Sequence, residues 1–104
     1  MEAALRAIAQ PRRRMILKLV LHTEMTAGAI ASHFDLTRPA ISQHLTVLKG
    51  AGLVTERREG TRRLYRARRD GLEELRSSLE EFWDRRLDRL REAAEHAEAR
   101  SHDR

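Results

Sequence analysis

The sequence predicts a mainly α-helical chain that carries one β-hairpin and ends in a long helix. Apolar residues recur at intervals of three and four over much of the first 50 positions, the spacing of helices that bury one face. Two short runs of strand-forming residues flank a glycine near position 60. From position 70 to about 98, the apolar residues fall within an arc of about 140° on a helix.

The length and composition predict one small core. The chain has 104 residues, of which 40% are hydrophobic, so a second domain would lack the buried area for stability. We therefore expect a single domain, residues 1–104. No apolar run approaches the roughly 20 residues of a membrane span, and the N-terminus lacks a secretory signal, so we expect a cytoplasmic protein without a membrane partner. The absence of cysteine excludes disulfides and thiolate chemistry in this sequence.

Positive charge is concentrated in the first two-thirds of the chain. Residues 1–69 contain 14 Lys or Arg against 5 Asp or Glu, whereas residues 70–104 contain 7 against 11. A basic surface is typical of proteins that bind polyanions, because each neutralised phosphate releases condensed counterions. Since 19 of the 21 cations are Arg, a biased composition is the alternative explanation, and charge alone does not separate the two.

Two short helices are expected at the start of the chain. Residues 2–9 place Leu5 and Ile8 three positions apart, on one face of the first helix. Pro11 suits the first turn of the second helix, where its missing N–H costs nothing, and an apolar stripe continues to about His22. The first turn of the second helix is strongly basic, and its arginines could reach phosphates.

The next two helices are separated by a short turn, which is the arrangement of a helix-turn-helix over residues 26–49. Thr26 is a candidate N-cap for a third helix that reaches about Phe34. A fourth helix begins at Thr37, which can cap it, and ends at Gly50, where we expect the left-handed C-terminal conformation.

The fourth helix has one apolar face and one short, uncharged polar face. At about 100° per residue, Ile41, Leu45 and Leu48 share the buried side. The opposite side centres on Gln43, whose amide can form two hydrogen bonds with adenine in a major groove. Solvation of an exposed helix is the alternative interpretation. The candidate DNA contacts on this helix are Thr37, Arg38, Ala40, Ser42, Gln43, His44, Thr46 and Lys49.

A basic hairpin is expected directly after this helix, within residues 53–67. Its two strand-like runs turn at Gly60, and four arginines surround the turn. A projecting basic hairpin beside a groove-reading helix can reach a minor groove or the DNA backbone, as a wing does. A solvated charged loop is the alternative, and the position after the fourth helix favours the wing. The candidate contacts are Arg57, Arg58, Arg62 and Arg63.

The last helix, residues 70–98, would be roughly 42 Å long, which exceeds the span of a 100-residue globule. One chain cannot cover its apolar stripe, so we expect a homodimer in which this helix pairs with its copy, supported by residues 1–10. A stripe that lies wholly on its own core is the alternative. Residues 99–104 are expected to fray. The candidate interface residues are Leu5, Ile8, Leu79, Phe82, Trp83, Leu87 and Leu90.

Three segments of the chain resemble the ArsR/SmtB family of bacterial repressors. Residues 36–54 resemble the recognition segment of that family, residues 59–66 its wing, and residues 9–17 the start of its second helix. The resemblance implies a winged helix-turn-helix with a β-hairpin wing and a long C-terminal dimerisation helix. It also implies a homodimeric repressor of its own or adjacent genes, bound to double-stranded DNA at a palindromic operator. The inducing ligand or signal is unknown.

The metal-sensing members of that family have ligands that this chain lacks. Their cysteine pair would fall at Thr26 and Gly28, neither of which binds a soft metal. In their site on the last helix, Asp84 would be followed two residues later by His, and His96 three residues later by His or Glu; an Arg and Ala99 stand there. We predict no metal and no cofactor, with carboxylates and His96 across a dimer as the remaining alternative.

The sequence does not indicate an enzyme. It contains no Gly-rich phosphate loop, nucleophile elbow or metal-binding helix motif. The alternative to a DNA-binding repressor is a winged-helix protein-interaction module, in which the last helix docks a partner and the basic charge is incidental. Such a module should show neither sequence preference on DNA nor a steep dependence on salt.

Overall fold

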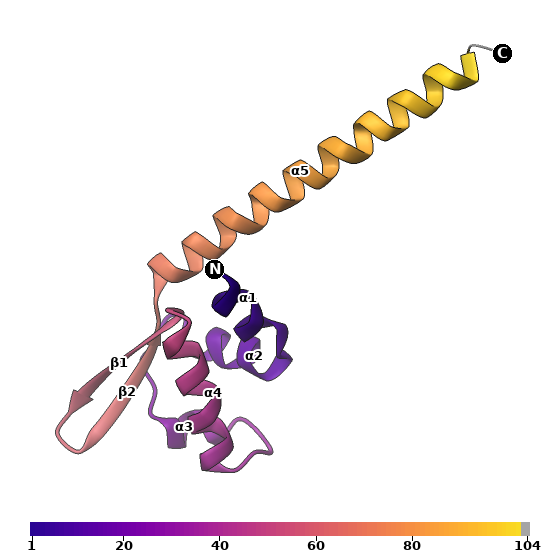
Figure 1. The fold of residues 1–104 in the computed structure, drawn as a ribbon. Coiled ribbons are helices and arrows are strands. Elements are labelled where there is room, and N and C mark those ends of the chain that lie inside the picture. Colours follow the sequence, from indigo (N-terminus) through magenta and orange to yellow (C-terminus); the bar gives the residue numbers. More distant parts are fainter. Residues whose placement is uncertain (103–104) are drawn as a thin grey trace.

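A hairpin and a long helix project from a body of short helices (Figure 1). The computed structural model describes the backbone of residues 1–102 and the side chains of residues 1–100. The expected fold class, mainly α-helical with one hairpin and a long C-terminal helix, is confirmed. In chain order, the elements are α1 (Glu2–Ala9), α2 (Pro11–Leu19), α3 (Ala27–Ala31), α4 (Arg38–Gly50), β1 (Val54–Glu59), β2 (Arg62–Ala67) and α5 (Arg69–His102).

Helix α2 ends at Leu19, so the expected end at about His22 is wrong. The carbonyl of Val20 accepts a hydrogen bond from the N–H of Ala67 at 2.9 Å. In a continuing helix this carbonyl would accept from the residue four positions further on. The bond to the end of β2 therefore takes the chain out of the helix.

Helix α3 is also shorter than expected, because it ends at Ala31 rather than at about Phe34. Its start is as expected: the Thr26 hydroxyl accepts a hydrogen bond from the N–H of Ala29 at 3.1 Å. The N–H groups of His33 and Phe34 bond three residues back, at 3.0 Å each. Residues 32–34 thus continue as tighter turns than an α-helix makes.

Helix α4 begins after Thr37, whose hydroxyl accepts a hydrogen bond from the N–H of Ala40 at 3.3 Å, so the expected N-cap is confirmed. At the other end, the expected left-handed Gly50 is wrong. Gly50 is still helical, and the left-handed residue is Gly52, with φ +76°. The N–H of Leu53 bonds to a carbonyl five residues back at 3.0 Å, which is the closing bond of a Schellman cap.

Strands β1 and β2 pair antiparallel with Glu59 opposite Arg62, which leaves a two-residue turn. The first turn residue, Gly60, has φ +62°, a conformation that favours glycine. Each strand has six residues and is longer than the strand-like runs 53–55 and 63–66 in the sequence. Tyr65 of β2 also exchanges two backbone hydrogen bonds with Met25, at 2.8 and 3.0 Å. The segment before α3 is therefore fastened to the hairpin, which the sequence does not predict.

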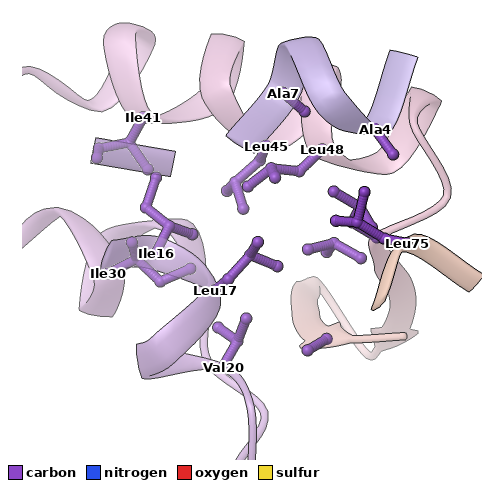
Figure 2. Packing of buried hydrophobic residues seen from close by; sticks show 13 residues of the cluster. Ala4, Ala7, Ile16, Leu17, Val20, Ile30, Ile41, Leu45, Leu48 and Leu75 are labelled. Atoms are coloured by element: carbon purple, nitrogen blue, oxygen red, sulfur yellow. The ribbon is translucent and has the colours of Figure 1, made fainter. Parts of the chain in front are cut away.

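The hydrophobic core lies between α4 and the other helices of the body (Figure 2). Ile41, Leu45 and Leu48 project from α4 toward Ile16 and Leu17 of α2, and all five side chains are buried. The expected buried face of α4 is thus confirmed. The other members of the buried cluster are Ala4, Ala7, Val20, Ile30, Leu53, Val54, Ala67 and Leu75.

Only the first part of α5 packs against this body. Leu75 is buried, Leu72 and Leu79 are half-buried, and the described side chains beyond Leu79 are exposed. The molecule is 75 Å long as a result. The expected helix over residues 70–98 is confirmed, but residues 99–102 are helical rather than frayed, and the last two residues of the expected tail lie outside the described part. No described helix has the length and hydropathy to cross a membrane.

The start of α5 lies close against the cap of α4 at Gly71. A Cβ atom on Gly71 would lie 1.9 Å from the carbonyl oxygen of Gly52, and a backbone atom in a cap cannot move aside without breaking it. We predict that Gly71→Ala lowers the free energy of unfolding by about 1–3 kcal/mol or more. Urea denaturation followed by circular dichroism, at one fixed protein concentration, measures this change.

The matched control for this prediction is Gly50→Ala. A Cβ atom on Gly50 meets nothing within 4 Å, so the change should leave the stability unchanged or raise it by up to about 1 kcal/mol through helix propensity. If Gly71→Ala proved as stable as Gly50→Ala, the close approach at Gly71 would have no energetic importance.

Candidate nucleic-acid interface

The polar face of α4 points away from the core. Ser42, Gln43, Thr46 and Val47 are all exposed, on the side opposite the buried leucines and isoleucine. The Thr46 hydroxyl donates a hydrogen bond to the carbonyl of Ser42 at 2.9 Å, which uses its proton. Gln43 lies at the centre of this face, which carries amide and hydroxyl groups but no charge.

His44 lies at the side of this face rather than on it. Its side chain is half-buried, as is Ala40 one turn earlier. Burial lowers the pKa of His44 below its usual value, and the positive charges of Arg13 and Arg12 lower it further. The imidazole is therefore mainly uncharged at neutral pH, where it can donate or accept one hydrogen bond.

The N-terminal end of α4 lies beside α3. Thr37 is exposed, but its hydroxyl already caps the helix. Arg38 is exposed too, and its guanidinium lies next to Gly28, where an added Cβ would be 3.7 Å from Cζ. The Arg38 side chain therefore lies beside α3, at ordinary contact distance from position 28.

One carboxylate of the wing is shared between two expected contact residues. Glu56 Oε2 lies 2.9 Å from Lys49 Nζ, and Glu56 Oε1 lies 3.5 Å from Arg63 Nε. The hydrogen bond from Lys49 is the main cause of a lowered pKa of Glu56, and the charges of Lys49, Arg63 and Arg58 add to it. Lys49 and Arg63 are therefore partly neutralised within the chain.

Arg57 is neutralised in the same way, on the other face of the hairpin. Its Nε lies 2.7 Å from Glu24 Oε2, and its Nη2 lies 2.9 Å from Glu59 Oε2. Both hydrogen bonds raise the pKa of Arg57. Neither acidic partner is among the residues expected from the sequence. Arg57 and Glu59 have opposite charges two positions apart, which places them on the same face of a strand, whereas nothing in the sequence connects Arg57 to Glu24, 33 positions away.

The remaining expected cations differ from these in having no such partner in the described part of the chain. Within the described residues, no carboxylate lies within 4.0 Å of Arg38, Arg58 or Arg62. Arg38 and Arg62 lie on opposite sides of a polar cleft of about 480 Å³ between the start of α4 and the wing. The cleft is lined by Thr26, Ala27, Gly28, Arg38, Ser42, Thr61, Arg62, Arg63 and Tyr65.

Two of the basic residues at the start of α2 have a structural role. Arg13 Nε donates to the carbonyl of Ala7 at 2.7 Å, and Arg14 Nη1 donates to the carbonyl of Ile8 at 2.6 Å. These carbonyls lie at the end of α1 and have no partner within that helix. Arg13 and Arg14 thus fasten α1 to α2, and Arg12 is the exposed cation that remains.

The residues expected at a dimer interface lie along α1 and α5. Leu5, Leu79 and Phe82 line an apolar groove of about 300 Å³ between the two helices, together with Met1 and Ser78. The further apolar residues of α5 are exposed, up to 66% for Leu90, and Ile8 is half-buried at the edge of the core. The exposed residues are Trp83, Leu87 and Leu90.

No metal centre is formed by the described residues, among which no three His, Cys, Asp or Glu side chains come together. His96 is exposed on α5, and Thr26 and Gly28 lie at the start of α3.

Comparisons with known proteins identify the family. Residues 10–56 match the family described as bacterial regulatory protein, arsR family. The HTH-type transcriptional regulator Rv2034 of Mycobacterium tuberculosis is 43% identical over 86 residues, which cover 83% of this chain and 80% of that protein. The transcriptional repressor SdpR of Bacillus subtilis is 45% identical over 60 residues, which cover 58% of this chain and 67% of that protein.

Solved structures agree with this match. A possible transcriptional regulator for arsenical resistance is 46% identical with a TM-score of 0.75, and the match covers 84% of this chain and 91% of that one. The homodimeric winged helix-turn-helix DNA-binding domain Mb0332 of Mycobacterium bovis is 34% identical with a TM-score of 0.65, and the match covers 83% and 80%. The relatives are DNA-binding transcriptional regulators and not enzymes. This chain belongs to the arsR family of bacterial regulatory proteins.

Proposed function

We propose that this chain is a sequence-specific repressor that binds a palindromic operator as a homodimer and controls its own gene or adjacent genes. The observation that supports this most is the exposed, uncharged face of α4 beside a wing in which Arg58 and Arg62 have no acidic partner among the described residues. The uncharged face suits close approach to base edges, and free arginines suit phosphates. Such a protein acts in the cytoplasm.

In this proposal, α4 of the helix-turn-helix (residues 26–49) enters the major groove. Gln43 lies at the centre of its exposed face, where it can contact a base, and Ser42 and Thr46 flank it. Arg38 and Arg62 bind the DNA backbone on either side of the cleft between α4 and the wing (residues 53–67). The full set of proposed DNA contacts is Thr37, Arg38, Ala40, Ser42, Gln43, His44, Thr46, Lys49, Arg57, Arg58, Arg62 and Arg63.

A homodimer is proposed because one chain leaves the apolar stripe of α5 uncovered. Trp83 is 59% exposed, and no segment of the described chain packs on it or on the apolar residues that follow. The relative Mb0332 is homodimeric. Two-fold pairing of residues 70–98, with residues 1–10 beside them, would place two copies of α4 about 34–36 Å apart, one turn of DNA. Repression needs no further domain, because a dimer bound at a promoter blocks it.

The experiment that tests the function measures binding to the DNA upstream of the gene and to a scrambled duplex of equal length. Purified protein is titrated at two salt concentrations, and the number of chains per duplex is recorded. We expect preference for the upstream DNA, two chains per site, and weaker binding at higher salt. Absence of any preference would instead support a winged-helix protein-interaction module.

The contact of Gln43 can be tested by Gln43→Ala. We expect a loss of about 1–3 kcal/mol in binding to the upstream DNA and little change with the scrambled duplex, because a base contact carries the sequence information. Arg62→Ala is the comparison, since it should weaken both duplexes about equally. Fluorescence anisotropy measures all four affinities. Equal losses on both duplexes for Gln43→Ala would contradict the assignment.

The difference between free and paired arginines predicts their salt dependence. Arg62→Ala should reduce the slope of log K against log [salt] by about one, because Arg62 has no acidic partner among the described residues to leave when it binds a phosphate. Arg57→Ala should change the slope less, since Glu24 and Glu59 already neutralise Arg57. A salt series with the scrambled duplex measures both slopes. Equal reductions would mean that the ion pairs of Arg57 open on DNA.

The dimer interface can be tested by Leu87→Lys. A charge in the apolar stripe of α5 should convert the dimer to a monomer, as measured by sedimentation equilibrium, and weaken binding to the upstream DNA. Glu92→Lys is the control, because residue 92 lies about 140° around the helix from Leu87, outside the stripe. A dimer that survives Leu87→Lys would place the interface elsewhere.

A further inference from the structure

The carboxylate of Glu56 connects α4 to the wing. The Glu56 side chain is only 15% exposed, and its two oxygens lie 2.9 Å from Lys49 Nζ on the last turn of α4 and 3.5 Å from Arg63 Nε on β2. The Lys49 and Arg63 side chains are each 56% exposed. A mostly covered anion thus holds two exposed cations, one from each of the two elements proposed to contact DNA.

At the level of Glu56, the hairpin is also held by the two backbone hydrogen bonds between Tyr65 and Met25. At its base, Val54 and Ala67 are buried, and at its tip the residues from Arg57 to Arg63 are exposed. Glu56 lies two residues from Val54, so it is on the same face of β1, whereas Arg57 faces the opposite way and bonds to Glu24. The two acidic residues therefore brace the hairpin from opposite faces, and Glu56 is the one that ties it to α4.

Glu56 remains charged under ordinary conditions. The hydrogen bond from Lys49 lowers its pKa, and three cations nearby lower it further. A permanent negative charge inside a basic surface reduces the net charge of Lys49, Glu56 and Arg63 together from +2 to +1. This charge weakens the attraction for phosphate, while its two contacts hold Lys49 of α4 beside Arg63 of β2.

We propose that Glu56 is a positioning residue for DNA recognition: it fixes the wing relative to α4 and limits how strongly the basic surface binds DNA of any sequence. The inference rests on the proposed DNA-binding function. Glu56 contacts no base or phosphate in this scheme. It acts through Lys49 and Arg63. It lowers the affinity for DNA of any sequence and raises the ratio of the affinity for the operator to the affinity for other DNA.

The test compares Glu56→Gln with Glu80→Gln. Both variants remove one negative charge from an ion pair, but Glu80 lies on the exposed part of α5, paired with Arg76. Glu56→Gln should steepen the salt slope on a scrambled duplex by about one. It should also lower the ratio of upstream to scrambled affinity about two- to fivefold, the range expected for one partly exposed ion pair. Glu80→Gln should match the unmodified chain in both measurements.

A double variant separates charge from position. Lys49→Met with Glu56→Gln returns the net charge of the group to +1, so the salt slope should return to its original value. The affinity ratio should stay low, because the link between α4 and the wing is still missing. Recovery of both quantities would mean that Glu56 acts through charge alone and would overturn the positioning role, as would a Glu56→Gln variant with unchanged slope and ratio.

A measurement without DNA keeps this inference apart from the proposed function. Amide hydrogen exchange in residues 57–64 should be faster in Glu56→Gln than in Glu80→Gln, because the wing has lost its ion-paired contact with α4. Failure of the unmodified chain to prefer its upstream DNA would count against the function itself. Normal preference together with unchanged exchange and ratio in Glu56→Gln would count against the role of Glu56 only.

Discussion

The burial of one face of α4 is the constraint on which the rest of the structure depends. Ile41, Leu45 and Leu48 are almost completely buried, and each contributes about 1.5–3 kcal/mol when removed from water. Because a helix turns by a fixed angle per residue, fixing this face also fixes the opposite one. Gln43 must then point outward, so the exposed surface that we propose for a DNA groove follows from core packing.

The cations of the basic surface form two sets, which differ in whether they are paired with carboxylates. Arg57, Lys49 and Arg63 are bound to carboxylates of the chain, whereas Arg38 and Arg62 are not, among the residues described. Exposed pairs of this kind stabilise a fold only slightly, so their effect on geometry and on net charge matters more than their energy. The wing is therefore a braced basic element, in which only some arginines are available for phosphates.

Helix α5 has two different parts. Its first turns belong to the core, where Leu75 is buried and Gly71 lies against the cap of α4. Beyond Phe82, the described side chains of α5 are exposed, and pairs such as Arg85 with Glu81 support the helix along its polar surface. In the proposed homodimer, a second copy on the apolar stripe would complete the fold, and dimerisation would then be part of the stability of α5.

The sequence by itself determines the local features of this protein: the order of the elements, the cap at Thr37, the turn at Gly60 and the buried face of α4. These depend on residues within a few positions of each other, where helical spacing, capping chemistry and the conformational freedom of glycine act directly. Only the tertiary structure decides where α2 stops and which arginines remain free. These features depend on partners far apart in the chain, such as Val20 with Ala67 and Arg57 with an acid 33 positions away, whose meeting no local pattern encodes.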